Sequence, residues 1–230
     1  MVSIVVGTND FRAGLRAVLP HAEKLGKWLE YHRVRLDVGP ENVTLTATDR
    51  FTTALAIVSV HTHIDPELGA IDLTPDDCRS ILAEFKSGTD KEGDTEFILH
   101  IETTETHVVV TDSSGLIPGR ALKMLRQPVE ENFPDVALVL SKAHHAPPTT
   151  LEDMPIGGPL LARFRDASAA YKEPLVLEAN AGWRSLFIRC GDSFLGSASP
   201  AHVNPDALKA WADDWNERLP DPTSEQDAPA

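Results

Sequence analysis

Cysteine is scarce in this sequence, and long apolar runs are missing. The 230 residues include two cysteines, Cys78 and Cys190, too few for a disulfide framework. No run approaches the roughly eighteen apolar residues of a membrane-spanning helix. The opening "MVSIVVGTND" has neither the basic start nor the apolar core of a signal peptide. We therefore expect a cytoplasmic protein with two buried, reduced thiols.

Positive charge is also in deficit. Lys and Arg number 21 against 35 Asp and Glu, so the net charge is −14. This balance argues against a general nucleic-acid coat, because phosphate binding is driven by Lys and Arg. Cations that are concentrated on one face would still bind DNA, so their placement matters more than the sum. Residues 220–230 are expected to form a disordered acidic tail.

Motifs for phosphate binding, nucleophilic catalysis and metal binding are absent or weak. "VGTND" and "IGGP" fit neither glycine-rich phosphate-binding pattern, and no nucleophile motif surrounds Cys190. His61 and His63 alternate along one predicted strand, with no cysteine or carboxylate at ligand spacing. His144 and His145 are predicted to lie in a loop. We expect no enzymatic activity, no metal and no cofactor.

Asp49 and Asp112 are the best candidates for paired catalytic carboxylates. Each follows a Thr at the end of one predicted strand and precedes another strand. Because Asp readily accepts hydrogen bonds from turn backbone, we favour a structural role over acid–base chemistry. An enzyme with a small-molecule site in the Pro-, His- and Gly-rich insertion 144–159 is the least favoured alternative.

The first 126 residues contain the same order of predicted elements twice. A helix that begins near Asn9 or Asp10 and a helix capped by Thr74, with Pro75 in its first turn, each follow a short strand and precede three strands. The predicted strands are 2–6, 33–38, 43–48, 53–60, 70–73, 97–102, 106–111 and 120–125. The two Thr-Asp hairpins are therefore corresponding parts of two β-α-β-β-β units that share a sheet.

A third, stretched unit is predicted after the Pro- and acid-rich segment "RQPVEENFPD". "PDVALVLSKA" is expected to be its first strand and "LLARFRDASAAYK" its helix, followed by strands "LVLEAN", "SLFIRC" and "FLGSAS". The sequence thus predicts a first domain at 1–126, an interdomain linker at 127–135 and a second, shortened domain at 136–219.

A last helix, "NPDALKAWADDWNERL", is predicted to begin at Asn204 with Pro205 in its first turn. No strands follow it, so a fourth unit would lack its sheet. The apolar stripe of this helix consists of Leu208, Trp211, Trp215 and Leu219.

Each predicted helix carries cations directly after residues expected in the core. One residue is a rotation of about 100° on a helix, so these cations share one flank of the core-facing stripe. Together with Lys24, the candidates are Arg12, Arg16, Arg79, Lys86, Arg165, Lys172 and Lys209. If the units repeat around an axis, these side chains line one surface that binds the DNA backbone without reading sequence. An ordinary solvated helix face is the alternative.

The sequence resembles the sliding clamps of bacteria, the β subunits of DNA polymerase III. The resemblance rests on the repeat, on "FRAGLRAVL", on "RVRLDVGPENVTLTATDRFTTALAIVSV" and on "NFPDVALVLSKA". It implies an α+β fold of processivity-fold repeats of β-α-β-β-β units. In that family two half-units make one such fold, and six folds close a ring with helices lining a DNA channel and sheets outside.

The resemblance also implies a function and partners. We expect a homo-oligomeric clamp that encircles duplex DNA and tethers a DNA polymerase, with a clamp loader as a further partner. If the last helix takes a fourth channel position, three chains supply twelve helices and a trimer is favoured; otherwise a tetramer or an open assembly results. The alternative function is a clamp-like module or decoy that binds polymerase or clamp components without encircling DNA. A hydrophobic partner pocket is expected around Val129, Phe133 and Pro134.

Overall fold

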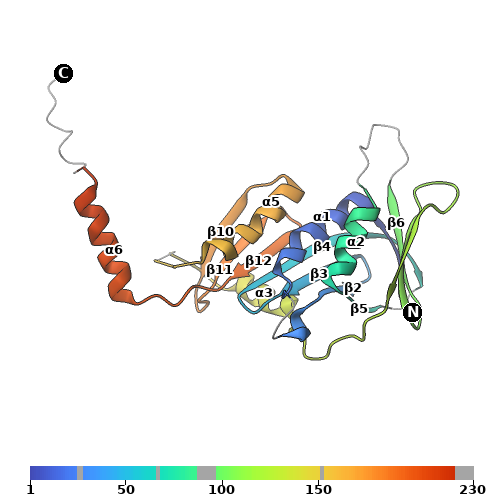
Figure 1. Cartoon of the computed structure of the whole chain (residues 1–230), viewed down its shortest axis with the longest axis horizontal. Coiled ribbons are helices and arrows are strands. Elements are labelled where there is room, and N and C mark those ends of the chain that lie inside the picture. The colour runs from blue at the N-terminus through green and yellow to red at the C-terminus, as the bar shows by residue number, and fades with distance from the viewer. Residues whose placement is uncertain (25–27, 66–67, 87–96, 151–152, 221–230) are drawn as a thin grey trace, which may run out of the picture.

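A computed structural model of the chain describes residues 1–24, 28–65, 68–86, 97–150 and 153–220 (Figure 1). The α-helices are α1 (Thr8–Val18), α2 (Pro75–Glu84), α3 (Val136–His145), α4 (Gly158–Leu161), α5 (Arg165–Tyr171) and α6 (Pro205–Arg218). Short 3-10 helices are η1 (Leu19–His21), η2 (Leu29–Tyr31) and η3 (Ala162–Phe164). The predicted acidic tail lies mostly outside the described residues.

The strands form one twelve-stranded antiparallel sheet, which confirms the predicted α+β class. The strands are β1 (Ser3–Gly7), β2 (Val34–Val38), β3 (Asn42–Thr48), β4 (Thr52–Asp65), β5 (Gly69–Leu73), β6 (Ile98–Thr103), β7 (His107–Asp112), β8 (Ala121–Leu125), β9 (Pro148–Thr149), β10 (Leu175–Asn180), β11 (Leu186–Cys190) and β12 (Phe194–Ala198). Their main order is β8-β7-β6-β1-β4-β12-β11-β10-β9, and β3, β2 and β5 branch from β4.

The long strand β4 joins the parts of this sheet. Its first residues pair with β12 on one edge, from Thr52 to Ala56, and with β3 through Ser59. From Val60 onward it pairs with β1. The two predicted domains are therefore linked by continuous strand pairing as well as by the segment 127–135, which contains neither helix nor strand.

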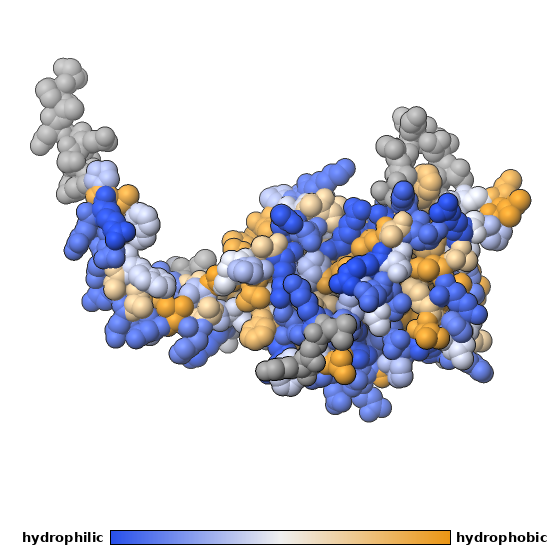
Figure 2. Space-filling view, viewed as in Figure 1, coloured by the Kyte–Doolittle hydropathy of each residue, from blue (hydrophilic) through white to orange (hydrophobic). Residues whose placement is uncertain are grey.

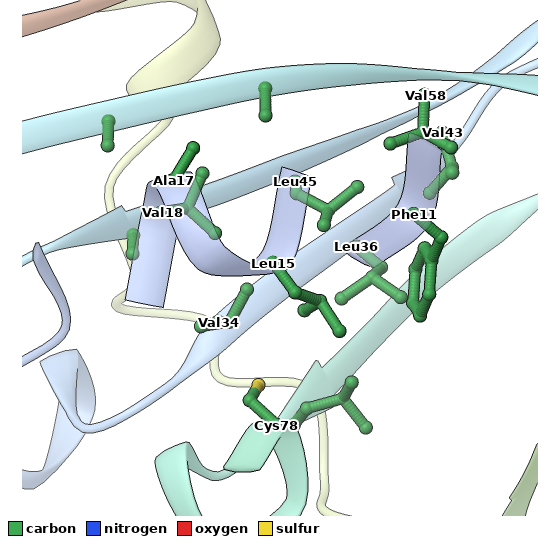
Figure 3. Packing of buried hydrophobic residues seen from close by; sticks show 14 of the residues in the cluster. Phe11, Leu15, Ala17, Val18, Val34, Leu36, Val43, Leu45, Val58 and Cys78 are labelled. Carbon is green, nitrogen blue, oxygen red and sulfur yellow. The ribbon is translucent and has the colours of Figure 1, made fainter. Parts of the chain in front are cut away.

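Helix α1 packs its apolar stripe onto one face of the sheet. Phe11 and Leu15 are fully buried, and each contributes about 1.5–3 kcal/mol by leaving water. They lie against side chains of the strands beneath them, as Figure 3 shows. At Gly14 the helix approaches the sheet so closely that a Cβ atom would lie 2.9 Å from Cγ2 of Val58. A glycine is required at this position because α1 sits directly on the strands.

The third unit covers the same face through η3 and α5. Phe164 is fully buried, and its ring lies over β12, where a Cβ at Gly196 would be 2.6 Å from Phe164 Cε1. Helix α1 contacts both α5 and α2, so the three helices form one layer in front of the strands (Figure 1). The predicted helix "LLARFRDASAAYK" is confirmed as the consecutive elements α4, η3 and α5.

Helix α3 corrects the prediction of a strand at "PDVALVLSKA". Asp135 caps the helix by accepting a hydrogen bond from the Leu138 N–H at 2.8 Å. Val136, Leu140 and Ala143 are buried at helical spacing, whereas Leu138 is 48% exposed. A short apolar run fits either a strand or a buried helix by composition, and the spacing of its buried residues decides for the helix.

Helix α3 covers the opposite face of the sheet from α1. Its cluster includes Leu55 and Phe187, whereas the neighbouring residues Ala54, Ala56 and Ile188 belong to the core that contains α1. Because successive side chains of a strand point to opposite faces, the two clusters lie on opposite sides. The layers are thus α3, then the sheet, then α1, α2 and α5.

The predicted start of α2 is confirmed, whereas the predicted caps of α1 are not. Thr74 accepts from the Asp77 N–H and the Asp77 carboxylate accepts from the Thr74 N–H, a capping box that confirms the predicted start of α2. The predicted caps of α1 are wrong, because the helix begins at Thr8 directly after β1 and Gly7 makes no side-chain cap. Asp10 instead accepts a hydrogen bond from the Ser59 N–H.

Candidate nucleic-acid interface

The layer of α1, α2 and α5 presents three of the predicted cations on one surface. Arg16, Lys24 and Arg79 are exposed. Arg16 lines a hollow of about 350 Å³ between the helices, and Lys24 and Arg79 line an adjacent hollow of about 470 Å³. Both hollows share Leu19, Pro20 and Asp166, so the three cations surround one continuous area of the helix face. The fold thus brings together residues that are up to 63 positions apart in the sequence.

The remaining helix-face cations are exposed at its margins. Arg165 precedes Asp166 on α5, and its guanidinium lies 3.6 Å from that carboxylate. Lys172 ends α5 with a left-handed backbone (φ 58°). Lys86 follows α2 and lines a separate hollow together with Arg120.

Acids are interspersed with these cations. Asp76 forms an ion pair with Arg79, and Glu23 lines the same hollow as Lys24 and Asp166. Both side chains of the Asp76–Arg79 pair are largely exposed, so water and salt screen their attraction. The helix face therefore carries both signs of charge, with its cations accessible to a ligand.

Arg12 does not belong to this surface. It is 5% exposed, and its Nη1 donates to the carbonyl of Leu82 at 2.6 Å and to that of Phe85. Burial, followed by the nearby charge of Arg16, lowers its pKa. Its guanidinium satisfies carbonyls at the C-terminal end of α2, which is a favourable place for a cation. The predicted contact of Arg12 with DNA is corrected to a structural link between α1 and α2.

Lys209 is separated from the other candidates. It lies on α6, which extends away from the body at the end of the molecule opposite β6 (Figure 1). Trp211, Trp215 and Leu219 are 55%, 60% and 58% exposed, whereas Leu208 in the first turns of α6 is half-buried, so only the start of the apolar stripe packs on the chain. Helix α6 therefore does not join α1, α2 and α5 in one layer, and the expectation of a trimer loses its basis.

The predicted partner pocket is partly filled by the chain itself. Phe133 is 6% exposed and packs with the α3 cluster, and the guanidinium of Arg35 lies 4.7 Å from its ring centroid. Pro134 is half-buried, and Val129 is 43% exposed. Because Phe133 already has its packing partners, it is a structural anchor of the linker and is not free to capture a peptide.

A buried carboxylate holds the linker against the first domain. Asp72 accepts hydrogen bonds from Arg33, from Arg35 and from the Glu130 N–H, at 2.8 to 3.0 Å. Burial alone would raise the pKa of Asp72, but the hydrogen bonds from Arg35, Glu130 and Arg33 outweigh it and lower the pKa. No pattern in the sequence indicates this network, because it depends on β2 pairing with β5, which places Arg35 opposite Asp72.

Asp49 is also a structural residue, as predicted for the first Thr-Asp hairpin. One oxygen accepts from the N–H groups of Phe51 and Thr52 within the turn, and the other lies 2.5 Å from Arg163 in η3. In the second hairpin Asp112 accepts from the Ser114 N–H and hydroxyl. The two carboxylates serve separate turns. Arg163, which ties the first turn to the third unit, was not singled out by the sequence analysis.

The histidines do not form a metal site. Among the residues that the structure describes, no group of three or more His, Cys, Asp or Glu could hold a metal ion. His63 bonds through Nε2 to the carbonyl oxygen of Pro40 at 2.9 Å. His144 and His145, predicted to lie in a loop, form the end of α3. In the same described part of the chain, no helix is long and apolar enough to span a membrane.

Comparisons with known proteins identify the fold. No protein-family model and no curated protein matches the sequence. The β subunit of DNA polymerase III from Thermotoga maritima matches in structure with a TM-score of 0.67 at 12% identity, over 91% of this chain and 67% of that one. A sliding clamp from Pseudomonas aeruginosa, bound to griselimycin, matches with a TM-score of 0.63 at 13% identity, over 96% and 68%.

A third structure agrees with these two. The β chain of DNA polymerase III from Streptococcus pneumoniae matches with a TM-score of 0.62 at 14% identity, over 91% of this chain and 67% of that one. The chain thus spans about two thirds of the length of the structures it matches. Its fold is that of the bacterial DNA sliding clamps.

Proposed function

We propose that this protein is a DNA sliding clamp that encircles duplex DNA as a homo-oligomeric ring and tethers a DNA polymerase. The observation that carries the proposal is the layer of α1, α2 and α5, with Arg16, Lys24 and Arg79 exposed on a clamp fold. The cations supply contacts to phosphates, which hold DNA without reading its sequence. The interspersed acids keep the affinity low, as sliding requires.

The ring is proposed to contain four copies of the chain. Each chain contributes three helices to the layer, so a ring lined by twelve such helices takes four copies. Its mass would be about 100 kDa from a chain of 25.1 kDa, and a three-copy ring would be about 75 kDa. A DNA polymerase and a clamp loader are the proposed partners, and the proposed place of action is the cytoplasm.

The salt dependence of DNA binding tests the proposed contact surface. Arg16→Gln combined with Arg79→Gln removes two phosphate contacts. Each contact contributes about −0.9 to the slope of log affinity against log salt, so we expect the slope to become shallower by roughly 1.8. The measurement is fluorescence anisotropy of labelled duplex DNA over a series of salt concentrations.

A cation on the opposite face provides the matched control. Lys142 is exposed on α3, across the sheet from the helix layer. Lys142→Gln is expected to leave the slope unchanged. Equal slopes for the double variant and the wild type would remove the α1–α2–α5 face from DNA binding and would favour an interaction module that does not encircle DNA.

A further inference from the structure

Beyond the half-buried Leu208, the apolar stripe of helix α6 is not covered by any part of the described chain. Trp211 and Trp215 are four residues apart, so they lie on one side of the helix, and Leu219 directly follows its last residue. Each of the three is more than half exposed. Tryptophans bury a large area and dominate the energy of protein interfaces. The helix carries four acids and two cations between Asp206 and Arg218, which leaves it with negative charge.

The opposite end of the molecule has the complementary character. Strand β8 pairs with β7 and is the last strand in the main order of the sheet, so no strand among the described residues pairs with its other edge. Leu116, Ile117 and Leu125 are 107%, 79% and 69% exposed there. The tip of the loop between β7 and β8 appears as an orange patch in Figure 2.

This end is positively charged over a long stretch of sequence. From Ser113 to Val129 there is no acidic residue, and Lys123 and Arg126 are exposed. Arg120 is exposed as well, but its guanidinium forms an ion pair with Glu84 of α2 at 3.0 Å. We define the β8 end as Leu116, Ile117 and residues 120–126. Its exposed aliphatic side chains and its cations match the tryptophans and the negative charge of α6.

We propose that α6 of one copy docks on the β8 end of a second copy. In Figure 1, α6 and β6 lie at opposite ends of the long axis, and β8 is joined to β6 through β7. A chain therefore cannot bring its own α6 to its own β8 end. The contact is head-to-tail, and such contacts build rings when the rotation between copies closes.

Charge decides between this partner and the simpler pairing of two α6 helices. A symmetric α6–α6 contact brings two negatively charged helices together, which repel each other. Docking on the β8 end replaces that repulsion by attraction, which also guides the two copies as they approach. The inference rests on the proposed ring and specifies the surfaces that close it.

A mixing experiment with two variants tests this contact. The helix variant carries Trp211→Ala and Trp215→Ala, and the edge variant carries Lys123→Glu and Leu125→Ser. All four side chains are exposed, so both chains are expected to fold, which circular dichroism checks. In analytical ultracentrifugation each variant alone is expected to sediment as a single chain of 25.1 kDa.

A 1:1 mixture is expected to form a two-chain species of about 50 kDa, because it contains one intact α6 facing one intact β8 end. Asp213→Asn, on the side of α6 opposite the stripe, serves as the control and is expected to retain the wild-type mass. Association of the edge variant with itself would show an α6–α6 contact and overturn the proposal. A wild-type mass for the helix variant would overturn it as well.

The proposed function is tested separately by retention of the wild-type protein on circular DNA. If the mixture forms its two-chain species but the wild type leaves circular and linear DNA equally fast, the head-to-tail contact stands and the clamp function fails. If the wild type is retained on circular DNA while the helix variant keeps the wild-type mass, the clamp function stands and the α6 contact fails.

Discussion

Arg12 and Arg16 lie one helical turn apart on α1, yet their side chains have different environments. Arg12 is buried and donates to carbonyls at the end of α2, whereas Arg16 is exposed beside α5. The sequence pattern placed both on one flank of α1. It did not reveal that α2 packs over Arg12, because that contact depends on the tertiary fold.

Substitution by glutamine is expected to lower stability at Arg12 and to weaken DNA binding at Arg16. Arg12→Gln removes charged hydrogen bonds from buried carbonyls and is expected to cost about 1.5–3 kcal/mol of unfolding free energy in urea denaturation. Arg16→Gln is expected to change stability by about 0.5 kcal/mol or less and to weaken DNA binding. A stable Arg12→Gln protein with weakened DNA binding would contradict the structural role of Arg12.

The stability that Asp49 contributes is expected to depend on pH. Burial alone would raise its pKa, but the Thr52 N–H and the Arg163 guanidinium outweigh burial, so the pKa lies below the ordinary value of 3.8. A lowered pKa in the folded state adds stability that is present above pH 3.8 and is lost as the pH falls below it. Asp49→Asn is therefore expected to cost about 1.5–3 kcal/mol at pH 7 and less at pH 3.

Asp112→Asn is the matched control for this prediction, since Asp112 occupies the corresponding turn and accepts hydrogen bonds from Ser114. It is expected to cost about 0.5–1.5 kcal/mol. Thermal denaturation of the two variants between pH 3 and pH 7 provides the measurement. A loss of stability at Asp49→Asn that stays constant over this range would exclude the charged link to Arg163.

At the scale of elements, local sequence signals located most of the structure. Thr74 and Pro75 mark the start of α2, alternation along 43–48 marks a strand, and the short apolar run at 186–190 marks a buried one. These signals act within a few residues of the chain. The apolar run before Ala143 was wrongly predicted to be a strand, because the choice between strand and helix there depends on which residues face the sheet.

Helix α3 provides a direct test of that correction. Leu140 is fully buried and Leu138 is 48% exposed, although the two residues would share a face in a strand. Leu140→Ala is expected to cost about 2–5 kcal/mol of stability. Leu138→Ala is expected to change it by about 0.5 kcal/mol or less. Equal losses of unfolding free energy for the two variants in chemical denaturation would contradict the helix and favour a strand.

At the scale of the whole molecule, the repeat predicted the fold but not the contacts that join the third unit and the linker to the first domain. The pairing of β4 with β12 and the Asp72 network both join residues far apart in the sequence. Periodicity carries no information on such pairings. Arg16, Lys24 and Arg79 remain DNA contacts predicted from the sequence, whereas the burial of Arg12 and the protrusion of α6 required the structure.

The central claim is that copies of this chain surround duplex DNA. Its most direct test is to bind the protein to nicked circular DNA, wash with high salt, and then cut the circle with a restriction enzyme. Salt screens phosphate contacts but does not remove a closed ring. The account predicts that protein stays on the circle through the wash and leaves once the DNA is linear. Complete loss during the wash, or equal retention on both forms of DNA, would contradict it.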